Sequence, residues 1–142
     1  MTTNPAFDFW LGRWEVTDAA EGSIGTNTIR RILGGAVIEE RFAIAGPDGK
    51  PYRGRSHTAY VEGRGWCQTW VDTTGLYLDF VGAATDGGMT LERTAALDGK
   101  PVTQRMQWSD ITADSLVWQW MRAPEGSDEF ELLCRLDYRR TG

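Results

Sequence analysis

Turn signals recur along the chain at intervals of about ten residues, and the runs between them are rich in β-prone residues. Asp-Gly pairs stand at 48–49, 86–87 and 98–99, and such pairs supply the positive φ angles that tight hairpins require. We find no run with the 3.6-residue periodicity of a long amphipathic helix. The chain is therefore predicted to be all-β.

Short strands are expected between these turns, and their even spacing is typical of an up-and-down antiparallel barrel or of a sandwich. Residues 7–12 predict one short helical turn that closes an end of the domain. The expected strands span residues 13–20, 24–33, 36–45, 52–61, 66–73, 76–83, 89–97, 101–109, 116–123 and 129–140.

Composition narrows the class of protein. A chain of 142 residues, 41% hydrophobic and 25% charged, fits one globular domain over residues 1–142. Its net charge of −5 repels phosphate backbones, so we expect no nucleic-acid partner. The sequence shows no secretory signal and no apolar run long enough for a membrane helix, so no membrane partner is expected. Cys67 and Cys134 fit reduced thiols in a cytoplasmic protein.

Side chains alternate across a strand, so each run divides into an inward and an outward face. In the last strand the alternation predicts one shared face for Phe130, Leu132, Cys134, Leu136 and Tyr138. Across the earlier strands, the rows expected to face inward carry the candidate ligand-binding residues Trp66, Gln68, Trp70, Arg93, Gln104, Trp108, Trp118, Trp120 and Arg122.

These rows bring several indoles together with a few polar groups. A barrel of about eight strands has room for its own side chains or one small ligand, and ten strands leave more. An aromatic wall with sparse polar groups suits a small, mostly hydrophobic or aromatic molecule. The alternative is that the tryptophans simply fill a packed core.

Three residues are candidates for acid–base chemistry. His57 is the only histidine and the default proton donor or acceptor, unless it lies on a solvated basic strand with Arg53 and Arg55. Glu40 either lies buried with a raised pKa or forms an ion pair with an inward arginine, Arg93 or Arg122. Asp72 is either a polar ligand contact or the cap of the turn at 73–75.

Other chemistries find no support in the residue pattern. One histidine and two separated cysteines give no cluster with zinc-like spacing, so no metal site is expected. The sequence has no G-x-S-x-G elbow, phosphate-cradling glycine loop or dinucleotide fingerprint, and no cofactor is expected.

Two segments carry a family resemblance. The opening at residues 7–16, with Gly12 and Trp14, resembles the start of the uncharacterised lipocalin-like bacterial proteins grouped as DUF1579, within the calycin superfamily. Residues 108–118 and the end at 138–140 are similar to the closing hairpin of the same group. The resemblance implies a closed antiparallel barrel of the lipocalin or fatty-acid-binding-protein kind. It also implies that Trp14 plugs one barrel end beneath Arg139 or Arg140.

The sequence leaves three functions open. The first is binding of a small hydrophobic or aromatic molecule in a tryptophan-lined cavity, and the second is a cofactor-independent cyclase, isomerase or lyase that uses the same cavity. The third is a structural or interaction protein with a filled interior. A homodimer through an exposed strand face is compatible with all three.

Overall fold

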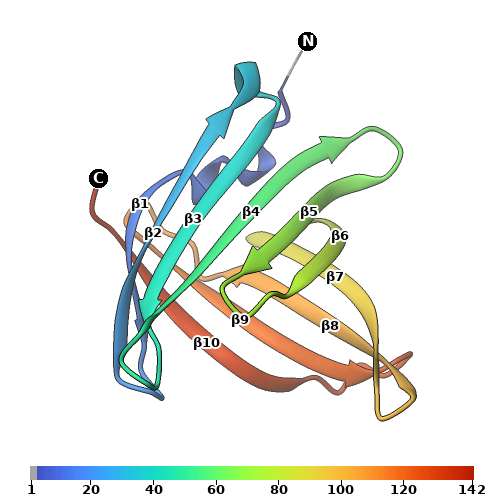
Figure 1. Cartoon of the computed structure of the whole chain (residues 1–142). Coiled ribbons are helices and arrows are strands. Elements are labelled where there is room, and N and C mark those ends of the chain that lie inside the picture. Colours follow the sequence, from blue (N-terminus) through green and yellow to red (C-terminus); the bar gives the residue numbers. More distant parts are fainter. Residues whose placement is uncertain (1–2) are drawn as a thin grey trace.

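Each strand pairs antiparallel with its sequence neighbours, and the first and last strands pair with each other, so the sheet forms a closed ring. The structure is a computed structural model that describes residues 3–142. Figure 1 shows the strands wrapping around one axis. The strands are β1 (Gly12–Asp18), β2 (Ser23–Ile32), β3 (Val37–Ala45), β4 (Pro51–Val61), β5 (Gly65–Asp72), β6 (Tyr77–Thr85), β7 (Gly88–Leu97), β8 (Lys100–Ser109), β9 (Ser115–Pro124) and β10 (Glu131–Arg140).

The predicted fold class is confirmed as an all-β, ten-stranded, closed antiparallel barrel. Each expected strand corresponds to one observed strand, with ends that differ by a few residues at most. The Asp-Gly signals lie in hairpin turns, where Gly49, Gly87 and Gly99 have positive φ angles. Besides the strands, a 3-10 turn (η2, Leu33–Gly35) connects β2 to β3. None of the helices among residues 3–142 has the length and apolar character needed to span a membrane.

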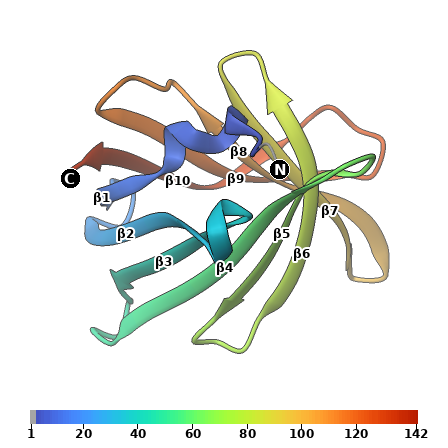
Figure 2. The ribbon, with the colours of Figure 1, turned by 90° about the horizontal axis from the view of Figure 1, so that it is seen from above.

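A short 3-10 helix, η1 (Pro5–Trp10), covers one end of the barrel. The side chain of Asn4 accepts a hydrogen bond from the backbone N–H of Ala6 at 3.0 Å, which caps the first turn. Phe7 and Trp10 on this helix are almost fully buried. Figure 2, which looks down on the barrel from above, shows η1 (blue) lying across the ring of strands.

The covered end is fixed by an arginine from the last strand. Arg140 lies over the ring of Trp14, with 4.1 Å between the guanidinium carbon and the ring centroid. It also donates hydrogen bonds to the carbonyl oxygens of Leu11 and Ala113 at 2.6 and 2.9 Å. Gly12 is required beneath it because a Cβ there would lie 2.3 Å from an Arg140 nitrogen. Of the two arginines considered from the sequence, Arg140 therefore contacts Trp14.

The seven tryptophans divide between the two halves of the interior. Trp10, Trp14 and Trp66 are nearly inaccessible to solvent and pack at the covered end around Phe7. The ring of Phe7 lies 4.8 Å from that of Trp10 and 5.5 Å from that of Trp66. Trp70, Trp118 and Trp120 line a hollow toward the open end, and Trp108 belongs to both halves because it lines the hollow and also packs edge to face on Phe7 at 5.0 Å. A packed core and a hollow therefore coexist in one barrel.

One predicted face is wrong. The pairing of β9 with β10 shifts register between Leu132 and Cys134, as a β-bulge does. The extra residue breaks the alternation, so Leu132 is 52% exposed and Phe130 lies against Arg105, 3.8 Å from its guanidinium. Leu136 and Tyr138, beyond the bulge, are buried as predicted.

Replacing Arg140 with Ala should destabilise the barrel by about 2–4 kcal/mol, because the cation–π contact and the hydrogen bonds to the carbonyls of Leu11 and Ala113 are lost together. Arg139→Ala is the matched control, since Arg139 pairs only with Glu15 on the surface and its side chain is 73% exposed. That control should cost about 0–1 kcal/mol. Urea unfolding followed by tryptophan fluorescence measures both, and equal losses would contradict the structural role of Arg140.

Candidate functional site

A cavity of about 340 Å³ occupies the half of the barrel away from η1. Its deep end is formed by Glu40, Trp108 and Tyr138. Asp18 and Asp72, at the ends of β1 and β5, and Leu76, which is 50% exposed, lie where it opens to solvent. The volume falls in the range of small-molecule sites, near its lower limit.

Aromatic side chains provide eight of the seventeen residues that line the cavity. The rings of Phe80 and Trp120 meet edge to face at 5.8 Å, and Phe42 contacts Tyr52 in the same way at 6.2 Å. Trp70 lies flat against β4 at Gly54, where a Cβ would come within 1.9 Å of the indole. Gly54 is therefore the residue that gives Trp70 its place in the wall.

Glu40 is a buried carboxyl group in this cavity, with 7% of its surface exposed. Its two oxygens accept hydrogen bonds from Asn27 Nδ2 and Ser56 Oγ, each at 2.7 Å. Burial raises the pKa of Glu40 above its usual range, and the two hydrogen bonds oppose this shift only in part. Among residues 3–142 it has no ion-pair partner, so the interpretation with a raised pKa describes Glu40 and the interpretation as an ion pair is wrong.

Tyr138 lies beside Glu40 and completes the deep end. Its hydroxyl accepts a hydrogen bond from Asn27 Nδ2 at 2.8 Å, and burial raises its pKa well above the ordinary tyrosine value. The indole N–H of Trp108 is buried without a partner among the described residues. The deep end therefore carries buried polar groups, one of them an indole N–H that can donate a hydrogen bond to an atom placed in the cavity.

Asp72 caps the turn after β5 and also lines the cavity. One carboxylate oxygen caps the turn after β5 by accepting from the backbone N–H and hydroxyl of Thr74. The other faces the cavity, where Tyr52 and Trp70 donate to it at 2.6 and 3.0 Å. Partial burial opposes ionisation, but these hydrogen bonds outweigh it and lower the pKa of Asp72 to about 2.

Asp18 and Cys134 form the opposite side of the mouth. One oxygen of Asp18 accepts from the backbone N–H groups of Ala20 and Glu21, while the other has only the thiol of Cys134 nearby, at 3.9 Å. Burial and the charge of Asp18 raise the pKa of the Cys134 thiol to about 11. The thiol is therefore a neutral part of the wall.

The structure brings together six of the residues singled out from the sequence and separates the others. Trp66 and Gln68 are buried but lie outside the cavity lining. Trp66 packs edge to face on Phe7, and Gln68 donates a hydrogen bond to Thr58 at 3.0 Å. The six that line the cavity are Glu40, Trp70, Asp72, Trp108, Trp118 and Trp120.

The inward polar row of β7–β9 does not reach the cavity. Arg93 donates a hydrogen bond to Gln104 at 2.6 Å, and Arg122 pairs with Glu131 at 3.1 Å. These residues are cross-strand neighbours in one row near the open rim. None of these residues lines the cavity, so their contact with a ligand stays a prediction.

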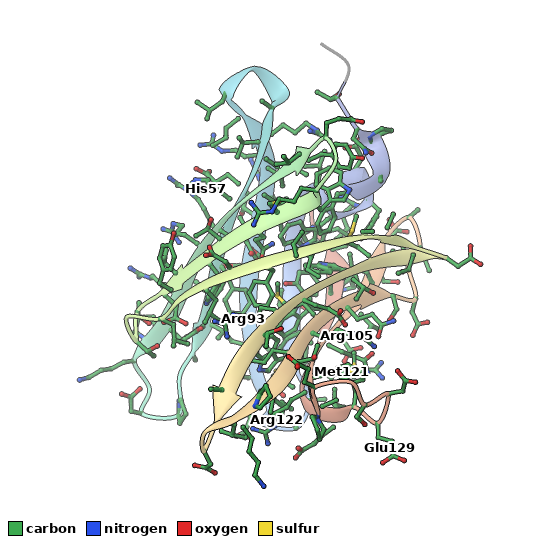
Figure 3. The ribbon with its side chains drawn as sticks, turned by 90° about the vertical axis from the view of Figure 1, so that its right-hand side faces the viewer. His57, Arg93, Arg105, Met121, Arg122 and Glu129 are labelled. Atoms are coloured by element: carbon green, nitrogen blue, oxygen red, sulfur yellow. The ribbon has the colours of Figure 1, made fainter. Side chains whose placement is uncertain are left out.

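His57 lies on the outer face of β4 and is exposed. Its cross-strand neighbours are Glu39 and Thr69, while Ser56 and Thr58 on the same strand are buried. Figure 3 shows His57 on the outside of the wall, away from Arg93 and Arg122. The surface position considered from the sequence is the one observed, and His57 cannot act on a molecule in the cavity.

Several cavity residues were not singled out from the sequence. Phe42, Tyr52 and Phe80 belong to inward rows that alternation identifies, but each is the only aromatic residue of its row on the cavity side. Tyr138 was recognised only as part of a buried face. Nothing in the sequence indicated that Asp18 lines a cavity, because an acidic residue beside a turn is usually solvated. The described residues include no group of three or more His, Cys, Asp or Glu side chains that could hold a metal ion.

With the barrel and its cavity defined, the chain can be compared with known proteins. No protein-family model matches the sequence, and no curated protein matches it. Among solved structures, it is similar to a de novo designed fluorescence-activating β-barrel, with a TM-score of 0.50 and 17% sequence identity. The match covers 98% of this chain and 100% of the designed chain. At this identity the similarity establishes the ten-stranded barrel fold and nothing about the ligand.

The stability of the Glu40→Gln variant relative to the parent should increase as the pH rises from 5 to 8. The folded state holds the Glu40 proton more tightly than the unfolded chain, so the parent loses stability as pH rises from the ordinary value of 4.5 through the raised pKa. Glutamine has no proton to lose in this range. Thermal unfolding of both proteins at several pH values measures the effect.

Glu39→Gln is the control for this experiment. Glu39 is the adjacent residue on the outer face, and its hydrogen bond with Arg30 lowers its pKa, so it stays ionised above pH 5. The difference in Tm between this variant and the parent should stay constant over the same range. A constant difference for Glu40→Gln as well would show that the Glu40 pKa is not raised.

Proposed function

We propose that this protein binds a small, mostly hydrophobic or aromatic molecule inside the barrel. The observation that carries the proposal is the cavity of about 340 Å³, whose wall is rich in aromatic side chains and whose mouth opens at the end opposite η1. A packed structural barrel would place side chains there, as this one does at its covered end. Aromatic area supplies affinity, and the polar groups at the deep end supply orientation.

The geometry favours binding over catalysis. A catalytic acid or base needs a group free to exchange a proton with a substrate. Both oxygens of Glu40 and both oxygens of Asp72 already accept hydrogen bonds, and His57 is outside. We therefore propose a binding protein rather than a cyclase, isomerase or lyase.

We further propose that the chain is related to the lipocalin-like proteins of the calycin superfamily, in the group DUF1579. What supports this is the end-plug arrangement, in which Gly12 admits Arg140 and Arg140 covers Trp14. Because the fold alone is shared by unrelated barrels, a sequence profile built from close homologues is the test. It should connect residues 7–16 and 138–140 to that group.

Trp70→Ala and Trp120→Ala should each weaken the binding of a hydrophobic fluorescent probe about tenfold or more, because each removes a large part of the wall. Val71→Ala is the matched control, since Val71 follows Trp70 on the same strand but is 41% exposed on the outer face. Fluorescence titration measures the affinity, and circular dichroism confirms that each variant is folded. If the tryptophan variants bind the probe as well as the parent does, the proposed function is wrong.

A further inference from the structure

Among the described residues, the cavity lining carries acidic side chains and no basic ones. Its lining contains the carboxyl groups of Asp18, Glu40 and Asp72, and no lysine, arginine or histidine among the described residues. The inward Arg93 and Arg122 lie outside this lining: Arg122 pairs with Glu131, whereas Arg93 donates to the neutral amide of Gln104 and its Nε has no partner among the described residues. A ligand carboxylate or phosphate would find no counter-ion in the wall, so its desolvation would go uncompensated.

The two aspartates at the mouth have the opposite effect on a cation. Asp72 is held ionised by its hydrogen bonds, and Asp18 keeps one carboxylate oxygen whose only neighbour is a weakly donating thiol. No arginine or lysine pairs with either carboxylate among residues 3–142. Their negative charge is therefore available to a ligand.

Aromatic rings stand beside Asp72. Tyr52 and Trp70 both donate hydrogen bonds to Asp72, and the ring of Phe42 lies 6.2 Å from that of Tyr52 and 6.4 Å from that of Trp70. Ring faces attract a cation, most strongly where water is partly excluded. The Asp72 carboxylate and these rings thus surround the same part of the cavity, and Asp18 faces them from the opposite side of the mouth.

We propose that the cavity selects a small organic cation with an apolar, preferably aromatic body over an anion of the same shape. The positive group lies at the mouth against Asp72 and its rings, with Asp18 adding negative charge from the opposite side, and the apolar body lies against Trp118, Trp120 and Phe80. The volume of about 340 Å³ suits a body of about two fused rings. This proposal rests on the proposed binding function and names the chemical class that the same cavity accepts.

Three probes of one shape test it: 2-naphthylmethylammonium, 2-naphthalenemethanol and 2-naphthoate. Isothermal titration calorimetry with the full chain should rank their affinities as cation, then neutral alcohol, then anion. We expect the cation to bind at least about tenfold more tightly than the anion. The gap should narrow when NaCl is raised from 50 to 500 mM, because the mouth is open to solvent.

Asp18→Asn and Asp72→Asn should each reduce the preference for the cation while leaving the alcohol's affinity within about twofold. Two variants are needed because Asp72 also caps a turn, and thermal unfolding verifies that each is folded. Glu62→Gln is the control: it changes the net charge equally but lies exposed after β4, at the covered end. It should leave the preference unchanged.

The outcomes separate this inference from the binding function. If no probe binds, the proposed function and the inference both fail. If all three bind with equal affinity, or the anion binds most tightly, the cavity binds small molecules but the charge selection is wrong. If Glu62→Gln lowers the preference as much as Asp18→Asn, the cation is attracted by the overall charge and the assignment to the mouth is wrong.

Discussion

The pairing of β1 with β10 is the contact on which the rest of the structure depends. It joins Trp14 to Arg140 and Val16 to Tyr138 across the seam, and it turns an open sheet with two free edges into a ring. The same pairing places Arg140 over Trp14 and Tyr138 beneath Asn27. The end plug and the deep end of the cavity are therefore both built on the seam.

The two halves of the barrel differ in how their aromatic side chains pack. Close-packed indoles around Phe7 provide buried area and edge-to-face contacts, which stabilise the fold. Trp70, Trp118 and Trp120 in the other half are only partly buried against this core and line the hollow, so they leave more aromatic surface accessible. A substitution in the first group should therefore affect folding, whereas one in the second should affect binding.

The fold was readable from the sequence because its determinants are local. Turn residues and alternation located all ten strands, and the Gly12 to Trp14 segment indicated which end is closed. The cavity was only partly predictable. Alternation identified Trp70 and Trp120 as inward-facing. It does not show where along the barrel axis the packed core ends and the cavity begins.

Features that depend on cross-strand register could not be predicted from the sequence. Because of the bulge after Leu132, Phe130, which precedes β10, lies against Arg105, although it fits the alternation of the strand expected over residues 129–140. Arg93 and Arg122 face inward as expected, yet their partners Gln104 and Glu131 come from other strands. Residue spacing along one strand does not reveal such partners, so the absence of a basic group in the cavity could not be foreseen.

The helix η1 at the closed end also has a kinetic consequence. With Phe7 and Trp10 buried there, a molecule in the hollow has one route in and the same route out. A second molecule cannot push the first through the barrel, so exchange must proceed by departure followed by entry. The residence time of a bound molecule then depends on the contacts it must break in the cavity and on its passage past the turns around the mouth.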